Sequence, residues 1–302
     1  MQYKTLGSTG VLVSRIGLGA MTFGDSPLGG LSRGEVDAIV GAAIDSGINF
    51  IDTANVYGVG ASESMLGYVL GARRNEIVLA TKFHSRMGPG VNDVGQSRLH
   101  LMSALEDSLR RLCTDHIDLY QVHNFDSLTP IEETLRALDD AVRSGKIRYI
   151  GCSNYAAWQL TKALGCSERQ GWTRFASVQS YYSLVGRDIE RELIPAVLDQ
   201  GVGLMCWSPL AGGLLSGKID RHGNDDPASR RARIDFPPVD PLRAFDVIDA
   251  LKAVAERHQV NAAEVAQAWL LSQPAVTSVI CGVTRLEHVT SAVRSASLSL
   301  SQ

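Results

Sequence analysis

The amino-acid sequence predicts an α/β protein and, within that class, a (β/α)8 TIM barrel. Eight short apolar runs alternate with seven connections that have helical patterns, and strand followed by helix is the repeat of this barrel. The runs are continuously apolar, as expected for strands buried on both faces. A chain of 302 residues is long for one domain, but barrels of about 250 residues form a single domain around one core. We therefore expect one domain over residues 1–302.

The first half of the chain supplies an N-terminal β-hairpin and four of the strands. Weak alternation around a Gly-rich turn predicts the hairpin over residues 2–14. Ser32 with Glu35 forms a capping box that starts the first helix, and Gly47 ends that helix. Ser62 is expected to cap the second helix. The strands of this half are expected over Ile16–Ala20, Ile48–Asp52, Glu76–Lys82 and Ile117–His123, with a helix over Ser97–Leu112 before the last of them.

The second half repeats the pattern. Thr129 with Glu132 forms another capping box, with Pro130 at the first helical position. After the seventh strand a loop of roughly thirty residues, rich in Gly, Pro, Asp and Arg, runs to about Asp240. Connections of that length are usually functional, so we expect a long lid loop. The strands are expected over Ile147–Cys152, Phe175–Gln179, Val202–Trp207 and Val276–Cys281, and the helices over Ala156–Leu164, Arg187–Gln200, Leu242–His258 and Asn261–Gln273.

An open, doubly wound sheet is the structural alternative. To bind a dinucleotide, that fold has the pattern GxGxxG after its first strand. In this chain the first strand leads into GLGAMTFG, which lacks that spacing. The sequence therefore favours the barrel.

The charge and hydropathy patterns exclude several classes of partner. Lys and Arg number 29 against 32 Asp and Glu, for a net charge of −3, and no basic run indicates nucleic acid. No apolar run approaches the roughly 20 residues that cross a bilayer, and the N-terminus MQYKTLGSTG lacks a signal-peptide pattern. Five cysteines without CxxC spacing indicate neither a disulfide framework nor a zinc site. We expect a soluble, cytoplasmic protein with no nucleic-acid, membrane or metal partner.

Polar residues gather at the ends of successive strands. Asp52 ends the second strand and Tyr57 lies in the loop after it, while Lys82 ends the third strand and His123 the fourth. In such a barrel the carboxyl ends of all strands meet at one rim, where active sites form. Taken alone, Asp52 and Tyr57 are ordinary loop polarity, and His123 is a structural histidine. Their coincidence at one rim predicts a catalytic site, and a metal site is disfavoured because Lys82 would repel the cation.

The chemistry of these four residues fits together. A tyrosine phenol has a pKa of about 10, too high for efficient acid–base catalysis near neutrality. An adjacent ammonium lowers that pKa, and a carboxylate paired with the ammonium holds it in place. Tyr57 would therefore be the proton donor, Lys82 the group that tunes it, and Asp52 the partner of Lys82. His123 would donate a hydrogen bond to the substrate oxygen and orient it.

These residues lie in motifs that resemble the aldo-keto reductase superfamily over nearly the whole chain. The motifs are, in order, GLGAMTFG, FIDTANVYG with SExxLG, ATK, DLYQVH, YIGCSN, SVQ, WSPLAGGLLSGK and a closing strand that ends in Gly282. The resemblance implies a barrel that binds an extended nicotinamide dinucleotide, usually NADPH with NADH as the alternative, and passes hydride reversibly to an aldehyde or ketone. It places the four catalytic positions at Asp52, Tyr57, Lys82 and His123.

The resemblance also implies which residues bind the cofactor. Ser153, Asn154 and Gln179 match the residues that hold the nicotinamide carboxamide, and Trp207 matches the ring that stacks on the nicotinamide. Backbone amides and one ammonium in the stretch after Trp207 would meet the pyrophosphate. The remaining cofactor positions are Met21, Ser208, Pro209, Leu210, Gly213, Lys218, Gly282, Thr284, Arg285 and His288.

The chain departs from the family pattern near its C-terminus. The family commonly has a basic or hydroxylated residue two places after the strand-end glycine, then a Gln and an Asn for the adenine. This chain has Thr284, His288 and Ala292 at those positions, with Arg285 one place late. We expect a preference for NADPH that is weaker than in relatives with the full set, with Arg285 as its main source. The chain ends about twenty residues after the last strand, so a C-terminal segment over the substrate pocket is expected to be short or absent.

Several alternatives stay open. The lid arginines Arg230, Arg231 and Arg233 form either a solvated face or contacts to phosphate or substrate. The chain also resembles the potassium-channel β subunits, nucleotide-sensing regulatory modules that share the barrel and the WSPLA motif. The sequence has no membrane-associated arm or N-terminal extension, which favours the reductase. The carbonyl substrate and the oligomeric state are left open.

Overall fold

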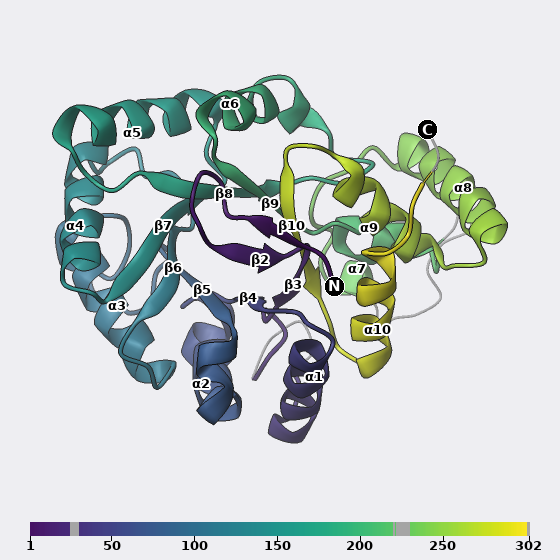
Figure 1. Cartoon of the computed structure of the whole chain (residues 1–302), viewed down its shortest axis with the longest axis horizontal. Helices are drawn as coiled ribbons and strands as arrows, with labels where there is room; N and C mark the ends of the chain where they lie inside the picture. Colours follow the sequence, from purple (N-terminus) through teal and green to yellow (C-terminus); the bar gives the residue numbers. More distant parts are fainter. Residues whose placement is uncertain (25–29, 220, 222–229, 301–302) are drawn as a thin grey trace.

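A closed barrel of eight parallel strands forms the centre of the computed structural model (Figure 1). The structure describes residues 1–24, 30–219, 221 and 230–300, without the side chains of residues 232 and 233. Neighbouring strands follow the chain order, and the last strand closes against the first. The predicted (β/α)8 barrel is confirmed. Its strands are β3 (Ile16–Gly19), β4 (Phe50–Asp52), β5 (Val78–Phe83), β6 (Ile117–Val122), β7 (Ile147–Ser153), β8 (Phe175–Tyr181), β9 (Gly203–Trp207) and β10 (Val276–Gly282).

The predicted N-terminal hairpin is also present and closes one end of the barrel. Its strands β1 (Tyr3–Thr5) and β2 (Leu12–Ser14) pair antiparallel. Leu6 and Val13 pack against side chains of the barrel interior, including Phe50. The turn residue Gly7 has φ +58°, and a Cβ there would meet the carbonyl oxygen of Ala176, so only glycine allows this close approach. The hairpin covers the amino ends of the strands, which leaves their carboxyl ends for the site.

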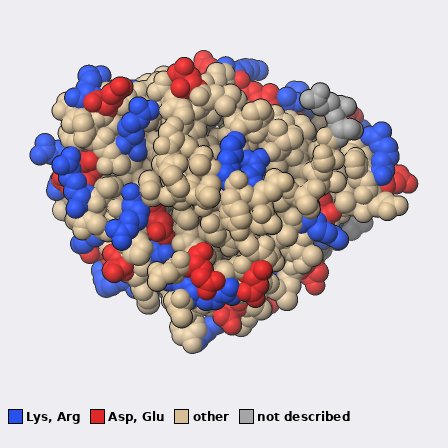
Figure 2. All heavy atoms as spheres, in the orientation of Figure 1, with Lys and Arg blue, Asp and Glu red and all other residues tan. Residues whose placement is uncertain are grey.

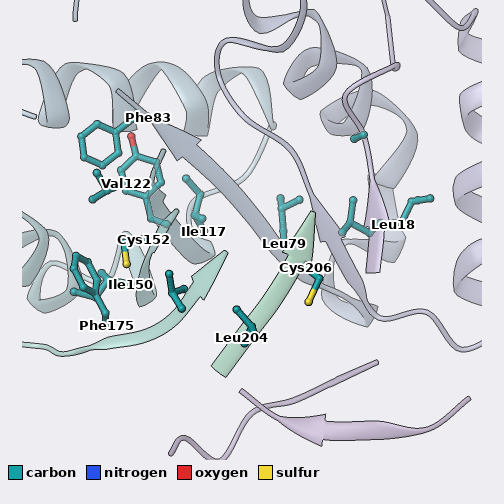
Figure 3. Close-up of a cluster of buried hydrophobic side chains, with 14 of the residues drawn as sticks. Leu18, Leu79, Phe83, Ile117, Val122, Ile150, Cys152, Phe175, Leu204 and Cys206 are labelled. Atoms are coloured by element: carbon teal, nitrogen blue, oxygen red, sulfur yellow. The ribbon is translucent and has the colours of Figure 1, made fainter. Parts of the chain in front are cut away.

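Helices surround the barrel and share one apolar core with the outer faces of the strands (Figures 1 and 3). Leu79, Ile150 and Leu204 are among the buried side chains of this core. Both faces of each strand are therefore covered, which explains the continuously apolar runs. The helices are α1 (Arg33–Asp45), α2 (Ala61–Leu70), α3 (Arg98–Arg111), α4 (Ile131–Arg143), α5 (Ala157–Gln170), α6 (Leu193–Gln200), α7 (Arg230–Arg233), α8 (Pro241–His258), α9 (Ala262–Ser272) and α10 (Leu286–Ser295).

Two helix starts differ from the prediction. Gly60, in the left-handed conformation, precedes α2, and Ser62 lies inside the helix, where its hydroxyl donates to the carbonyl oxygen of Ala20 at 2.7 Å. Thr129 donates to the nearby carboxylate of Asp126 at 2.7 Å, so it does not cap α4. The hydroxyl group that the capping pattern assigned to the helix thus donates to a distant carbonyl oxygen in Ser62 and to a carboxylate of the preceding loop in Thr129. The capping box at the start of α1 is confirmed, and Asn261 with Glu264 forms another at the start of α9.

The connection after β9 begins with a 3₁₀ turn over Ala211–Ser216 and continues through α7 and α8. Part of the predicted lid, residues 220 and 222–229, lies outside the described residues. On the face shown in Figure 2, acidic and basic side chains are interspersed, without a large area of one sign. None of the described helices combines the length and the apolar character that crossing a membrane requires.

Candidate active site

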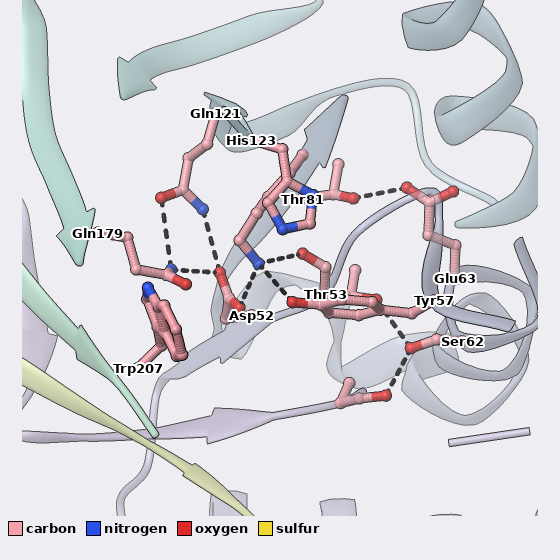
Figure 4. A network of polar contacts seen from close by, with 12 residues as sticks. Asp52, Thr53, Tyr57, Ser62, Glu63, Thr81, Gln121, His123, Gln179 and Trp207 are labelled. Carbon is pink, nitrogen blue, oxygen red and sulfur yellow. Dashed lines mark hydrogen bonds and ion pairs between the residues drawn. The ribbon is translucent and has the colours of Figure 1, made fainter. Parts of the chain in front are cut away.

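The four predicted catalytic residues meet at the carboxyl end of the barrel. Asp52, Tyr57 and His123 are labelled in Figure 4. Parallel pairing sets the ends of β4, β5 and β6 side by side, which brings Asp52, Lys82 and His123 to one rim. The Lys82 ammonium donates to Asp52 Oδ2 at 2.6 Å, to the carbonyl oxygen of Thr53 at 2.8 Å and to the Tyr57 hydroxyl at 3.4 Å. The rings of Tyr57 and His123 meet edge to face, with centroids 5.9 Å apart. The ammonium thus lies between the carboxylate and the phenol.

Burial sets the protonation of the phenol. Lys82 has no exposed surface and Asp52 only 2%. Burial lowers the pKa of Lys82, but Asp52 and Tyr57 raise it by more, so the group stays an ammonium. Burial raises the pKa of Tyr57, and the Lys82 ammonium opposes that rise without cancelling it. The sequence argument considered the ammonium alone, whereas the structure shows that burial outweighs it and keeps Tyr57 a protonated donor.

His123 lies beside Tyr57 as a neutral imidazole. Burial lowers the pKa of His123 to about 3, with Lys82 and His84 acting in the same direction. Its Nδ1 is buried and has no hydrogen-bond partner among the described residues. A neutral imidazole has one N–H donor and one acceptor, so His123 can donate a single hydrogen bond to a substrate oxygen without adding a second charge beside Lys82.

Two glutamines hold the other oxygen of Asp52. Gln121 Nε2 and Gln179 Nε2 donate to Asp52 Oδ1 at 3.0 Å and 2.9 Å. Sequence reasoning missed Gln121. It lies two residues before His123, so strand alternation points both side chains to the same side, and that signal would have found it. Gln179, which the resemblance assigned to the nicotinamide carboxamide, directs its amide nitrogen at Asp52 and keeps its oxygen for another partner.

A second buried acid fixes the loop that holds Tyr57. Glu63 in the first turn of α2 has no exposed surface. It accepts hydrogen bonds from Thr81 at 2.6 Å and from Arg111 at 2.7 Å, which ties α2 to β5 and α3. Thr81 is the neighbour of Lys82 in β5. Glu63 therefore fixes the start of α2 relative to the strand that holds the ammonium.

The residues predicted to bind the nicotinamide adjoin the catalytic four. Asn154, with φ +58°, donates to the carbonyl oxygen of His123 at 3.0 Å and accepts from Trp207 Nε1 at 3.0 Å. Ser153 is buried at the end of β7. The Trp207 ring lies parallel to Phe236 of the lid, with centroids 5.7 Å apart. This side of the rim therefore offers an aromatic ring and amide groups close to the proton donor.

The loop after β9 contains several glycines with positive φ. Ser208 Oγ accepts from the amide of Gly212 at 2.9 Å. Gly212, Gly213 and Gly217 have φ of +70°, +99° and +80°, which few other residues adopt. The amide of Gly213 donates to the carbonyl oxygen of Leu210 at 3.0 Å, so it too is paired within the loop. The same rim holds the remaining predicted positions, Met21 after β3, Pro209 and Leu210 after β9, and Gly282 at the end of β10.

Positive groups gather beside that loop, at the start of α10. Burial lowers the pKa of His288, and the positive charges of Lys218 and Arg285 lower it further. His288 Nδ1 accepts from the amide of Thr284 at 3.3 Å, so its Nε2 remains as the donor. The negative charge of Glu287 acts on the pKa of His288 in the opposite direction.

Comparison with known proteins agrees with this geometry. The chain matches the model of the Aldo/keto reductase family over residues 15–302. The chain belongs to this family. It is 40% identical to the uncharacterized oxidoreductase YrpG of Bacillus subtilis (strain 168), over 99% of this chain and 92% of that protein. It is 36% identical to the versiconal hemiacetal acetate reductase of Aspergillus parasiticus, over 99% and 94%, and 37% identical to a probable voltage-gated potassium channel subunit beta of Arabidopsis thaliana, over 96% and 89%.

Family membership and the reductase relatives support an oxidoreductase of small carbonyl compounds, and aldo/keto reductases generally use NAD(P)H.

The lid of this family member is more than a solvated face. Burial lowers the pKa of Arg230, and Tyr57 acts in the opposite direction. Arg231 donates to the carbonyl oxygens of Ala211 and Pro237, at 2.9 Å and 3.0 Å. The side chain of Arg233 lies outside the described residues.

Proposed function

We propose that this chain is an NADPH-dependent reductase of aldehydes or ketones, reversible in direction, with Tyr57 as its general acid and base. The observation that supports it best is the position of the Lys82 ammonium, 2.6 Å from the Asp52 carboxylate and 3.4 Å from the Tyr57 hydroxyl. A protonated phenol beside a fixed positive charge is suited to give up a proton to an oxygen that becomes negative. The neutral His123 supplies a second hydrogen bond to the same oxygen.

Each residue has a defined task in this reaction. The bound nicotinamide supplies the hydride to the carbonyl carbon. Tyr57 and His123 donate hydrogen bonds to the carbonyl oxygen, and Tyr57 transfers its proton there. Lys82 stabilises the phenolate that remains, and Asp52 holds Lys82 in place. In the reverse direction the phenolate accepts the proton from the alcohol.

The predicted cofactor residues lie in two parts of the rim, one for the nicotinamide and one for the phosphates. Ser153, Asn154, Gln179 and Trp207 would hold the nicotinamide end beside the catalytic residues. The loop after β9 would hold the pyrophosphate, and Thr284, Arg285 and His288 the 2′-phosphate. The charges of Lys218 and Arg285 around His288 support a preference for NADPH, because charge-assisted hydrogen bonds are the stronger kind.

A nucleotide-sensing regulatory module is the second candidate. The 37% identity to a potassium-channel subunit beta supports it. A sensor needs the cofactor residues but gains nothing from a tuned proton donor, so the complete set of four catalytic residues favours the reductase.

A carbonyl panel distinguishes the two candidates. The purified chain is given NADPH and a series of aromatic, aliphatic and carboxylate-bearing aldehydes and ketones, and the loss of NADPH absorbance is followed. Turnover that depends on the carbonyl and is lost in Tyr57→Phe supports the reductase. Tight NADPH binding without turnover of any carbonyl supports the sensor and overturns the proposed reaction.

A further inference from the structure

We propose that Gln121 is a positioning residue that fixes the orientation of the Gln179 amide and thereby links Asp52 to the nicotinamide end of the cofactor site. The inference rests on the proposed function, because it assigns Gln179 to the nicotinamide. Gln121 belongs neither to the four catalytic positions nor to the predicted cofactor positions, and the established family membership assigns it no task.

A closed triangle of hydrogen bonds supports this role (Figure 4). Gln121 Nε2 donates to Asp52 Oδ1 at 3.0 Å, and Gln179 Nε2 donates to the same oxygen at 2.9 Å. The third side joins Gln179 Nε2 to Gln121 Oε1 at 3.5 Å. Gln121 has no exposed surface and Gln179 has 3%, so water does not compete for these contacts.

The charge of Asp52 determines which way both amides face. An ionised carboxylate only accepts hydrogen bonds, so each glutamine must turn its NH2 group toward it. Gln179 then directs its second N–H at Gln121 Oε1, and its own Oε1 is the atom left for an external donor. The NH2 group of a nicotinamide carboxamide is such a donor. Without Gln121, the Gln179 amide keeps one contact and its oxygen is less well directed.

The neighbouring strand is shaped to leave room for this side chain. Gln121 pairs in register with Gly151 of β7. A Cβ at Gly151 would lie 3.3 Å from Gln121 Cγ and 2.7 Å from Ser177 Oγ, so a larger residue would displace the glutamine. The interior layer below is apolar, with Phe50, Leu119 and Met205 among its members. A buried amide is costly there unless it is hydrogen-bonded, and this one is bonded to the catalytic carboxylate.

Two substitutions separate positioning from space filling. Gln121→Met keeps the length of the side chain and removes both hydrogen-bonding groups, and Gln121→Glu keeps the length and places a second carboxylate beside Asp52. Calorimetry would measure binding of NADP⁺ and of 2′,5′-ADP, which shares the adenosine and its 2′-phosphate but lacks the nicotinamide. The control is Gln267→Met, which changes a buried glutamine on α9.

We expect Gln121→Met to weaken NADP⁺ binding by about threefold to tenfold, the value of one ordinary hydrogen bond, and to leave 2′,5′-ADP unchanged. The acidic limb of the pH profile for alcohol oxidation, where activity is lost as the Tyr57 phenolate becomes protonated, should move to higher pH, because the lost amide dipole had favoured the phenolate. Gln121→Glu should move it further in the same direction, since it adds a negative charge. Gln267→Met should change neither quantity.

Equal weakening of both ligands, or an unchanged affinity with an unchanged pH profile, would overturn the inference and leave Gln121 as packing. Thermal unfolding of each variant shows that it is folded, and if Gln121→Met does not fold, Gln121→Glu provides the same comparison. If the wild-type chain binds NADP⁺ but turns over no carbonyl, the proposed function fails, while the difference between the two ligands still decides the role of Gln121.

Discussion

Replacing Lys82 by methionine tests the centre of the site. The ammonium is fully buried and contacts Asp52, the carbonyl oxygen of Thr53 and the Tyr57 hydroxyl. Methionine fills a similar volume but leaves the Asp52 carboxylate buried without a counter-ion. Removing one partner of a buried ion pair costs about 3–5 kcal/mol in the free energy of unfolding. Because Gln121 and Gln179 still donate to Asp52, we expect the lower end, about 3 kcal/mol at pH 8.

The pH dependence of the stability loss in Lys82→Met identifies its cause. In Lys82→Met the Asp52 carboxylate is buried without its counter-ion, and burial of an unpaired charge favours the neutral acid. A carboxyl with a raised folded-state pKa takes up a proton on folding, so its cost is complete above that pKa and disappears as the pH falls below it. Urea unfolding should therefore show a smaller difference between Lys82→Met and wild type at pH 5 than at pH 8.

A double variant provides the control. In Asp52→Asn/Lys82→Met no charge is left unpaired, so it should be more stable at pH 8 than Lys82→Met alone. The two substitutions would then be strongly non-additive, as residues in direct contact usually are. A loss below about 1 kcal/mol that is equal at both pH values, with the double variant simply additive, would refute the pairing. Turnover of Lys82→Met should also fall, with a displaced pH profile, because the phenolate loses its stabilising charge.

Three further predictions follow from the same geometry. Tyr57→Phe should keep cofactor binding and lose about 10²- to 10⁴-fold in turnover; a variant that retains more than about a tenth of the wild-type rate with chemistry rate-limiting would remove Tyr57 from the role of acid. Arg285→Ala should weaken NADPH binding by about 1.5–3 kcal/mol, the value of a hydrogen bond to a charged group, and leave NADH nearly unchanged; equal weakening of both would show that Arg285 points to solvent. His123 has a folded-state pKa of about 3, below its unfolded value, so its contribution to stability is present at pH 8 and lost as the pH falls. Wild type should lose about 2 kcal/mol more than His123→Asn between pH 8 and pH 5, and parallel unfolding curves would contradict this.

The sequence predicted the barrel and the meeting of the four candidate catalytic residues because both depend only on position along the chain. An apolar run of strand length followed by a helix sets the repeat, and the carboxyl end of every strand reaches the same rim. Asp52 ends β4, Lys82 is the last residue but one of β5, and His123 directly follows β6. No tertiary information beyond the fold class was needed to bring them together.

Hydrogen-bond partners were harder to predict, since they depend on which of several neighbours lies nearest in space. Ser62 and Thr129 match the local capping patterns, yet Ala20 and Asp126 take their hydroxyl groups. Gln179 bonds to Asp52, a residue 127 positions away in the chain. The pKa of Tyr57 depends on the depth of burial, which the order of residues does not specify.

The buried polar side chains of Asp52, Lys82, Gln121 and Gln179 lie at the carboxyl end of the barrel. A role in the proposed reaction explains them better than a contribution to the stability of the fold. Replacing a buried ion pair by well-packed apolar residues of similar volume is often neutral or stabilising, and the layer below shows that this barrel accepts apolar side chains at its centre. The chain nevertheless buries an ammonium, a carboxylate and two amides there. The Asp52 carboxylate accepts a hydrogen bond from each of the other three groups. Such an arrangement restrains the ammonium beside the phenol before a substrate binds, so little reorganisation is needed when negative charge develops on the substrate oxygen. The comparison of wild type with the Asp52→Asn/Lys82→Met variant measures that arrangement directly, because the difference in their free energies of unfolding is what the fold gains or loses by keeping the buried ion pair next to Tyr57.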